Sequence, residues 1–432
     1  MSPQSPESLP PAGRREIVAW AMFDFANSSY TTVVVTFFFS LVFTQLIAAG
    51  PSADFWWGRA LWASNAIVLV LSPLVGAIAD ESGRKKAFLF ATYLLCIVST
   101  AALWFVQPGQ IPLAMALFIV SNIAFSFGEN FAGAFLPEIS TPYTIGRISG
   151  FGWGLGYFGG LASLALAFPL ARRGIALENF EHLRMIWPVT ALFFLVAGLP
   201  TFLVLQERAP RKSEPLAYYL RNGFRRLGET WRQARTFGQL VRFLFVFFLY
   251  SIGLTSTIAF FGVYAGTTLK FTVLELFGLG ALLQIPSALG AVAFGLVQDR
   301  LGAQRTLQIA LALWLVVSAT VALATEKRTF WIIAMVAGLG IGSVQASSRA
   351  LVGAFSPLRK SGEFFGLWGL AGKAAYACGP LIFGWVSSAT HSQRAAVWVN
   401  GAFFLAGLLG LFAVDETKGR RAAAEWVEPG TP

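Results

Sequence analysis

Long apolar segments, separated by short polar ones, make up almost the whole chain. A helix needs about 20 mostly apolar residues to cross a lipid bilayer, and the sequence contains twelve segments of that kind. They are much longer than the strands of a membrane barrel, so the pattern predicts an all-α membrane protein with twelve transmembrane helices. The segments run over residues 17–48, 58–79, 87–106, 112–136, 148–171, 185–205, 240–266, 273–298, 306–324, 330–352, 363–388 and 396–414.

A cluster of glycine and charged residues occurs twice between these segments. The first copy reads Gly76-Ala-Ile-Ala-Asp80-Glu-Ser-Gly83-Arg84-Lys85-Lys86, and the second reads Gly295-Leu-Val-Gln-Asp299-Arg300-Leu-Gly302-Ala-Gln-Arg305. The two aspartates are 219 residues apart (299 − 80), which is about half the chain. The repeat therefore predicts two pseudo-symmetric six-helix bundles.

Each copy suits a tight hairpin between two spans. We expect the first helix of each hairpin to end on a small residue, with the carboxylate just beyond the hydrocarbon and a glycine turn and basic residues after it. Such charges can pair across a sliding interface between the bundles, so we expect a gating role. The candidate gating residues are Gly76, Asp80, Gly83, Arg84, Lys85, Asp299, Arg300 and Arg305.

The composition agrees with a protein embedded in a membrane. Hydrophobic residues make up 56% of the chain, charged residues 12%, and the mean hydropathy is +0.64. A soluble protein carries about twice that share of charged residues. We expect an integral, multi-pass, monomeric protein of a bacterial inner membrane, surrounded by lipid.

The net charge of +11 lies mostly on one side of the predicted membrane. Because lysine and arginine favour the cytoplasmic side of a membrane protein, we expect both termini in the cytoplasm. This distribution also argues against a nucleic-acid partner. Outside the basic middle loop, the residues assigned to the cytoplasmic side are Arg14, Arg15, Arg84, Lys85, Lys86, Arg147, Arg300, Arg305, Arg349, Arg359, Lys360, Lys418, Arg420 and Arg421.

The chain divides into five expected regions. Residues 1–15 are rich in proline and serine, which predicts a disordered tail. We expect the N-terminal six-helix bundle over residues 16–206 and the C-terminal one over residues 239–415. Residues 207–238 form a basic cytoplasmic linker between them, and residues 416–432 form a cytoplasmic tail.

Two predicted spans carry acids on polar helix faces. Asp24, Asn27 and Thr31 share one face of the first span, and Glu129 lies on a polar face of the fourth. A carboxylate inside a membrane is costly, so it should face protein or a water-filled cavity. Asp24 and Glu129 fall at similar depth and are candidates for proton coupling. The alternative is that each acid braces its neighbouring helices.

Lys373 is the lysine placed deepest in a predicted span. It lies about ten residues into the eleventh span, which is about 15 Å along a helix and close to mid-membrane. A cation there can hold the carboxylate of an amino acid, or pair with Asp24 or Glu129 when the site is empty. The candidate substrate-binding residues are Asp24, Asn27, Tyr30, Asn122, Glu129, Asn130, Tyr157, Tyr250, Gln284, Gln345, Trp368, Lys373 and Tyr376.

The sequence offers no catalytic or cofactor motif. Cys96 and Cys378 fall inside spans and His182 and His391 lie in loops, so their spacing indicates neither a disulfide nor a metal site. A Gly-x-Gly-x-x-Gly pattern beginning at Gly154 lies inside an apolar span with no strand before it, which is typical of close helix packing rather than of dinucleotide binding. We expect no cofactor, no metal and no enzyme activity.

The repeated hairpins and the twelve spans resemble the major facilitator superfamily over residues 15–415. Four further motifs are similar to those of the vacuole-effluxer, autophagy-protein-22-like family: Asp24-Phe-Ala-Asn27-Ser-Ser-Tyr30, Leu136-Pro-Glu138-Ile, Gly154-x-Gly156-Tyr157-x-Gly159-Gly160 and Phe364-Phe-Gly366-Leu-x-Gly-Leu-Ala-Gly372-Lys373-Ala. The resemblance implies a substrate site between the bundles and efflux of amino acids. Two departures are Glu81, where the superfamily usually has a basic residue, and Ala303-Gln304, which replace basic residues in the second hairpin.

We therefore expect a secondary active transporter for a small polar metabolite. Two bundles that rock about a central site are the standard use of such repeats, and intramembrane acids suit proton coupling. The resemblance makes amino acids the expected substrate. Two alternatives stay open: a facilitator or exporter of another small organic solute, such as a sugar, a peptide or a drug-like compound, and a membrane receptor without transport.

Overall fold

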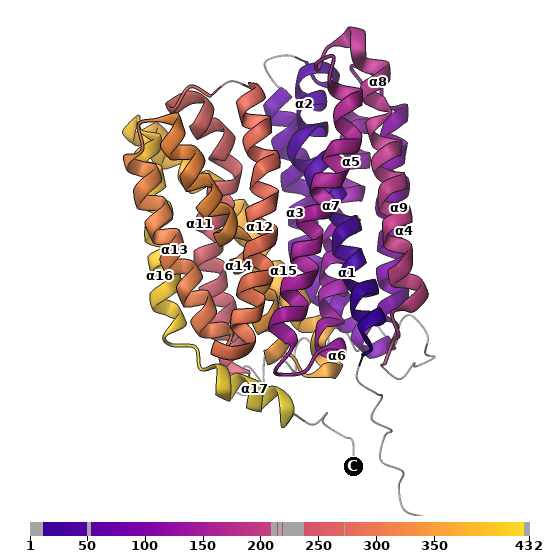
Figure 1. Ribbon diagram of the computed structural model, residues 1–432. Coiled ribbons are helices and arrows are strands. Elements are labelled where there is room, and N and C mark those ends of the chain that lie inside the picture. Colours follow the sequence, from indigo (N-terminus) through magenta and orange to yellow (C-terminus); the bar gives the residue numbers. More distant parts are fainter. Residues whose placement is uncertain are drawn as a thin grey trace, which may run out of the picture.

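The computed structural model describes residues 12–49, 53–208, 214, 218, 237–271 and 273–426. In these ranges the regular structure is entirely helical. Figure 1 shows two helical bundles side by side, one from each half of the chain. The start of α1 and the whole of α17 lie at the same end of the molecule, which we call the termini end. Most of the expected tail 1–15, most of the linker 207–238 and residues 427–432 lie outside the described residues.

The first bundle is formed by the chain before residue 205. Its longest helices each cover one of the expected apolar segments, and short helices occupy the turns. The elements are α1 (Arg14–Ser29), η1 (Tyr30–Phe37), α2 (Phe39–Val42), η2 (Phe43–Ile47), α3 (Ala53–Ser82), α4 (Lys85–Ala102), η3 (Leu103–Phe105), α5 (Ile111–Ala134), α6 (Leu136–Ile139), α7 (Ile145–Ala171), η4 (Leu177–Asn179), α8 (Phe180–Arg184) and α9 (Ile186–Val204).

The second bundle repeats this plan and adds a helix after the last long one. That added helix, α17, runs along the termini end of the molecule (Figure 1). The elements are α11 (Gly238–Thr268), α12 (Val273–Leu301), α13 (Ala303–Leu323), α14 (Lys327–Phe355), η5 (Leu358–Lys360), α15 (Ser361–Thr390), α16 (Gln393–Leu411) and α17 (Glu416–Ala424).

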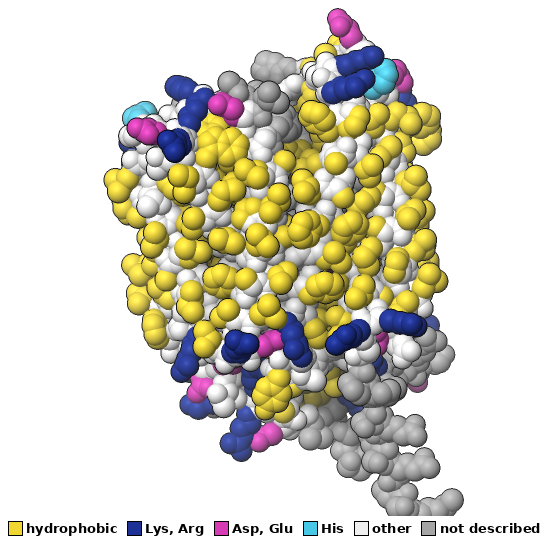
Figure 2. Space-filling view, viewed as in Figure 1, with side chains coloured by type: hydrophobic (Ala, Val, Ile, Leu, Met, Phe, Trp, Pro, Cys, Tyr) yellow, Lys and Arg dark blue, Asp and Glu magenta, His cyan; other side chains and the backbone are white. Residues whose placement is uncertain are grey.

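A broad apolar flank surrounds the bundles. Figure 2 shows hydrophobic side chains over the middle of the molecule and lysine and arginine gathered at its two ends. In the described residues, eleven helices are long and apolar enough to cross a membrane. The segment expected at 363–388 is helical in α15 but is not among the eleven, because its glycines, Glu363 and Lys373 lower its hydropathy. This helix packs against α3 and α11.

The two bundles meet along two helix pairs, α3 with α15 and α7 with α12. In the first pair, Gly76 lies directly against the backbone of Gly362. In the second, a Cβ at Gly295 would be 2.7 Å from the carbonyl oxygen of Gly146. Since Gly76 and Gly295 are the first residues of the two repeated clusters, the repeat brings backbones together at equivalent places.

Both hairpin helices are longer than the sequence indicates. We expected each to end on a small residue before its aspartate, but α3 continues through Asp80 to Ser82 and α12 continues through Asp299 to Leu301. Asp80 and Asp299 therefore lie in the last turn of a helix. The chain then turns at Gly83 and Gly302, whose φ angles of 62° and 86° favour glycine.

The first span is not a regular α-helix. Beyond Ser29 the chain widens into a π-helical segment, η1, before it regains α-helical hydrogen bonding in α2. π-helical turns are rare and often occur at functional sites. In this protein η1 contributes Thr31, Thr32, Val35 and Thr36 to the wall of a central cavity.

Candidate functional site

A cavity of about 460 Å³ lies between the two bundles. Its wall comes from α1, η1, α3, α5 and α7 on one side and from α11, α12, α13, α14 and α15 on the other. Nine of the residues proposed for substrate binding line it: Asp24, Asn27, Asn122, Glu129, Tyr157, Gln284, Gln345, Lys373 and Tyr376. The structure thus gathers side chains from both halves of the chain around one space.

Four other residues proposed for binding do not line this cavity, because their side chains bond or pack between helices. Tyr30 shares a 2.7 Å hydrogen bond with Ser121, and Tyr250 shares one of 2.6 Å with Ser348. Asn130 donates to Ser72 Oγ at 3.1 Å. Trp368 packs on the ring of Phe247, with ring centroids 5.8 Å apart. For Asn130 the reason is periodicity, since one residue along a helix turns a side chain by about 100° away from Glu129.

Asp24 is paired with an arginine from the other bundle. Arg349 Nη1 donates to Asp24 Oδ2 at 2.7 Å, and the Arg349 side chain is almost fully buried. Its Nε donates to Ser149 Oγ at 3.1 Å and its Nη2 to the Ser149 carbonyl at 2.9 Å. The guanidinium also lies over the rings of Trp20 and Trp153, at 4.9 and 5.2 Å. Every part of the cation is therefore compensated.

Close backbone approach makes room for this ion pair. At Gly152 of α7 a Cβ would lie 2.5 Å from Asp24 Oδ2 and 2.7 Å from Arg349 Nη2. Any other residue at that position would displace the pair. The glycine run of the fifth span thus serves a charged contact between bundles as well as helix packing.

Arg349 is the main residue that sequence reasoning missed. We assigned it to the cytoplasmic side as an orienting charge, and we expected Asp24 or Glu129 to pair with Lys373 instead. The structure places Arg349 inside α14, six residues before the helix ends at Phe355. A signal was available: Arg349 follows Gln345 by four residues, so the two share a helix face, and Gln345 was already a candidate for the cavity.

Glu129 and Lys373 line the cavity from opposite bundles and do not contact each other. Glu129 comes from α5 and Lys373 from α15, and both line the cavity. Neither makes a hydrogen bond or an ion pair within 4.0 Å to any residue that the structure describes. At longer range, the charge of Lys373 attracts Glu129 and that of Asp24 repels it. An anionic and a cationic group are thus both available to a ligand.

Further polar atoms in the cavity wall have no partner among the described residues. They include Asn27 Oδ1, Trp153 Nε1 and Trp314 Nε1, all of them buried. A buried polar atom costs free energy unless something bonds to it. The two tryptophans were not proposed from the sequence.

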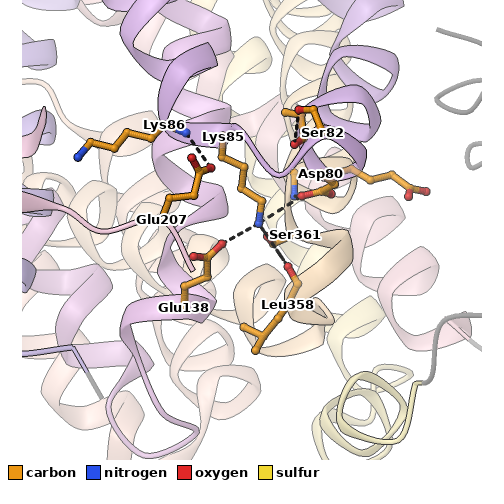
Figure 3. Close-up of polar contacts among 11 residues, drawn as sticks. Asp80, Ser82, Lys85, Lys86, Glu138, Glu207, Leu358 and Ser361 are labelled. Atoms are coloured by element: carbon orange, nitrogen blue, oxygen red, sulfur yellow. Dashed lines mark hydrogen bonds and ion pairs between the residues drawn. The ribbon is translucent and has the colours of Figure 1, made fainter. Parts of the chain in front are cut away.

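The first hairpin connects the two bundles at the termini end of the molecule. Asp80 accepts hydrogen bonds from the backbone N–H groups of Gly362 and Glu363, at 3.0 and 2.8 Å, and so caps the N-terminus of α15 in the other bundle. Lys85 lies 3.3 Å from Asp80 and 2.8 Å from Glu138. Figure 3 shows its amino group between these acids and the other bundle. There it donates to Ser361 Oγ at 2.6 Å and to the Leu358 carbonyl at 3.3 Å.

The second hairpin does the same in the opposite direction. Asp299 accepts from the N–H groups of Gly146 and Arg147, at 2.9 and 3.2 Å, and caps the N-terminus of α7 in the first bundle. The Arg147 side chain lies 3.6 Å from Asp299 and is 55% exposed. Each repeated aspartate thus holds the first turn of a helix that belongs to the other half.

Three of the proposed gating cations do not take part in these contacts. Arg84, Arg300 and Arg305 are exposed, and none of their side chains bonds or pairs with a described residue. They point outward because the hairpins dock through backbone N–H groups and through Lys85 instead. The cation at Asp299 that the sequence did not indicate is Arg147, which was assigned only a role in orientation.

The comparisons with known proteins agree with this geometry. Residues 63–424 match the family described as vacuole effluxer Atg22 like. The chain belongs to that family. It is 28% identical over 406 residues to a Bacillus subtilis protein named an uncharacterized MFS-type transporter, YxiO, covering 92% of this chain and 94% of that one. Autophagy-related protein 22 of Kluyveromyces lactis is 24% identical, with 83% and 78% covered.

Solved structures show the same fold. The human organic anion transporter MFSD10 superposes with a TM-score of 0.73 at 16% identity, over 94% of this chain and all of that one. The fucose transporter FucP in its outward conformation superposes with a TM-score of 0.71 at 12% identity, over 93% and 98%. The fold is that of the major facilitator superfamily, and the protein is a membrane transporter and not an enzyme.

Proposed function

We propose that this protein is a secondary active transporter that carries amino acids by alternating access. The proposal rests mainly on the central cavity, where Glu129 of one bundle and Lys373 of the other have no direct partner among the described residues. A zwitterion presents an ammonium and a carboxylate, which are the complements of these two groups. A ligand held by both would join the bundles, and its release would free them to move.

The relatives support transport, and efflux as its direction, but their descriptions name no substrate. The family description names vacuole effluxers, and several relatives are autophagy-related protein 22. Efflux is therefore the direction that we propose. The cavity volume supports a small molecule as cargo, since ligand pockets of about 300–1,000 Å³ hold compounds of that size.

We propose that protons drive the transport through Asp24 and Glu129. Both carboxylates line the cavity at which substrate arrives. Asp24 is held by Arg349 in this state, which is closed at the termini end. When the bundles separate there, Asp24 loses its cation across the interface, and a carboxylate that loses a cation takes up a proton more readily. Proton binding would then be tied to the conformational change.

The membrane arrangement follows from the charge distribution. We propose twelve spanning helices, with α15 as the span that is too polar to be recognised by hydropathy. We also propose that the termini end faces the cytoplasm of a bacterial cell, since most lysine and arginine residues belong to that end. The monomer is the transporting unit, because the cavity is complete within one chain.

The test is a flux assay with the purified protein in liposomes. Vesicles are loaded with a mixture of amino acids, sugars and organic acids, and release is followed by mass spectrometry with and without a pH gradient. We expect saturable exchange of amino acids that the gradient accelerates. Exchange of sugars or organic acids alone would overturn the substrate assignment, and amino-acid binding without flux would indicate a receptor.

A further inference from the structure

The two hairpins share their acid but not their base. With the offset of 219 residues, Asp80 corresponds to Asp299, and Lys85 corresponds to Gln304. Lys85 is buried and contacts both its own aspartate and the other bundle. Gln304 instead donates from its side chain to the Leu411 carbonyl of its own bundle, at 2.8 Å. The second hairpin therefore contains no counterpart of the buried lysine.

The C-terminal helix α17 brings a cation to this place. Asp415 begins the helix by accepting from the Lys418 N–H at 3.0 Å. Gly419 then packs on the ring of Phe355, which fixes α17 against α14. Glu416 accepts from the Gln304 N–H at 2.9 Å and so holds the second hairpin directly. The helix is therefore docked on the hairpin rather than trailing from the last span.

Arg420 reaches from α17 to the other bundle. Its Nε and Nη2 donate to Glu416 at 2.9 and 2.6 Å, and its Nη1 donates to the Pro142 carbonyl at 3.0 Å. Its positive charge also acts on the Asp299 carboxylate. Pro142 belongs to the turn before α7, the helix that Asp299 caps. Arg420 thus joins its own bundle, through Glu416, to the turn of the opposite bundle from which the helix capped by Asp299 begins.

The contacts of Lys85 and Arg420 correspond in two respects, although only Lys85 also contacts its aspartate directly. Each cation binds a glutamate of its own bundle, which is Glu138 for Lys85 and Glu416 for Arg420. Each also donates to a backbone carbonyl of the other bundle. The carbonyl of Leu358 lies three residues before α15 begins, and the carbonyl of Pro142 lies three residues before α7 begins.

We propose that Arg420 is the gating cation of the second hairpin, supplied by the C-terminal helix in place of the lysine that the first hairpin carries in its own turn. α17 is then part of the gate at the termini end, and its contacts favour the state closed at that end. The inference rests on the proposed alternating access. It concerns the balance between two conformations and does not depend on which substrate is carried.

The experiment measures access to the cavity from each side. Cys96 and Cys378 are replaced by alanine, and Thr31→Cys places a reporter in the cavity wall. An impermeant maleimide is added to sealed vesicles of each orientation, and protease access to a C-terminal tag identifies the termini side. Arg420→Ala should raise the labelling rate from the termini side by about threefold to tenfold and lower it from the opposite side.

A matched control and a rescue separate gating from loss of structure. Arg421→Ala removes the same charge from the next position of α17, where Arg421 pairs only locally with Glu425, and it should label like the parent. Adding Gln304→Lys to Arg420→Ala restores a cation beside Asp299 and should return labelling to the parent rate. If the alanine variant does not reach the membrane, Arg420→Gln takes its place with the same rescue.

The outcomes distinguish the two proposals. Equal labelling of Arg420→Ala and Arg421→Ala would overturn the role of Arg420, and so would failure of Gln304→Lys to restore the rate. If the parent protein labels from one side only, even with amino acids present, then alternating access itself is wrong.

Discussion

Three charged side chains line the cavity, namely Asp24, Glu129 and Lys373. Asp24 is engaged in an ion pair with Arg349, which lies behind the cavity wall, and the other two form an open pair. Arg349 binds Asp24 with additional partners on Ser149 and two tryptophan rings. Glu129 and Lys373 make no such contact within the described ranges. The two pairs therefore differ in their proposed roles. The ion pair of Asp24 and Arg349 connects the bundles, and Glu129 and Lys373 are available to bind a ligand.

Loss of Lys373 should strongly weaken amino-acid binding while leaving the fold intact. A hydrogen bond to a charged group contributes about 1.5–3 kcal/mol, so Lys373→Ala should weaken amino-acid binding by about 10- to 100-fold and reduce flux to background. Flux and substrate-dependent thermal stabilisation are measured on purified protein. Lys327→Ala is the control, because Lys327 pairs with Glu275 at a half-exposed position away from the cavity. Normal transport by Lys373→Ala would contradict the assignment.

The ion pair between Asp24 and Arg349 should show strong coupling in a double-mutant cycle. Removing one member of a buried pair leaves an uncompensated charge and costs about 3–5 kcal/mol, whereas removing both leaves none. Asp24→Asn and Arg349→Gln should each lower the thermal unfolding temperature in detergent, and the double variant should recover part of the loss. Additive effects of the two changes would show that the residues do not interact in solution.

At this scale, single side chains were predictable where periodicity placed them on a polar face. Asp24, Asn27 and Glu129 were found in that way. Arg349 was not, because a cation near a span end is usually an orienting charge, and only the partner helix shows that Asp24 lies opposite. Tyr30 and Tyr250 were proposed for binding but do not line the cavity, because a tyrosine gives no signal of which neighbour its hydroxyl will bond.

At the scale of helices and hairpins, the two aspartates act as caps for helices of the opposite bundle. Asp80 and Asp299 both bind two backbone N–H groups in a first helical turn. The repeat itself was visible in the sequence, and so was its position at span ends. The capped helices were not predictable, because nothing local to Asp80 indicates the start of α15 more than 280 residues later.

Removing a cap should move the balance between conformations more than it changes affinity. Asp299→Asn keeps one acceptor oxygen but removes the negative charge from the N-terminus of α7. Such a charge contributes about 0.3–2 kcal/mol, so the variant should shift the ratio of the two states by about twofold to thirtyfold towards opening at the termini end. Reporter-cysteine labelling measures the ratio, and equilibrium binding measures affinity. Asp415→Asn is the control, since Asp415 caps only its own helix α17. A pure loss of affinity with unchanged labelling would argue against gating.

At the scale of the whole molecule, composition and repeat were enough to predict the fold class. Apart from the first, which divides into four helical elements, each apolar segment coincides with one long helix, and the half-chain offset coincides with the division into bundles. The cavity could not be derived, because its wall needs the packing of ten elements from both halves. The π-helical η1 also escaped prediction, since its apolar sequence is compatible with an ordinary helix.

Proton coupling is a property of the whole transport cycle and is tested as such. Asp24→Asn and Glu129→Gln remove the charge and the titration but keep the shape of each side chain. We expect at least one of them to keep amino-acid exchange while losing accumulation driven by a pH gradient. Measuring both in the same vesicles separates the two activities. If both variants still accumulate substrate with unaltered pH dependence, then another ion drives the transporter or none does.

The unequal contacts of the two hairpins have a consequence for the path of the conformational change. The Lys85 side chain is buried, whereas Arg147 beside Asp299 and Arg420 beside Glu416 are partly exposed. Ions in solution screen exposed charges far more than buried ones. The interface between α7 and α12 should therefore open before the interface between α3 and α15. The bundles then separate first along α7 and α12, while α3 and α15 stay in contact beside Lys85. Water therefore enters the cavity from the α7–α12 side.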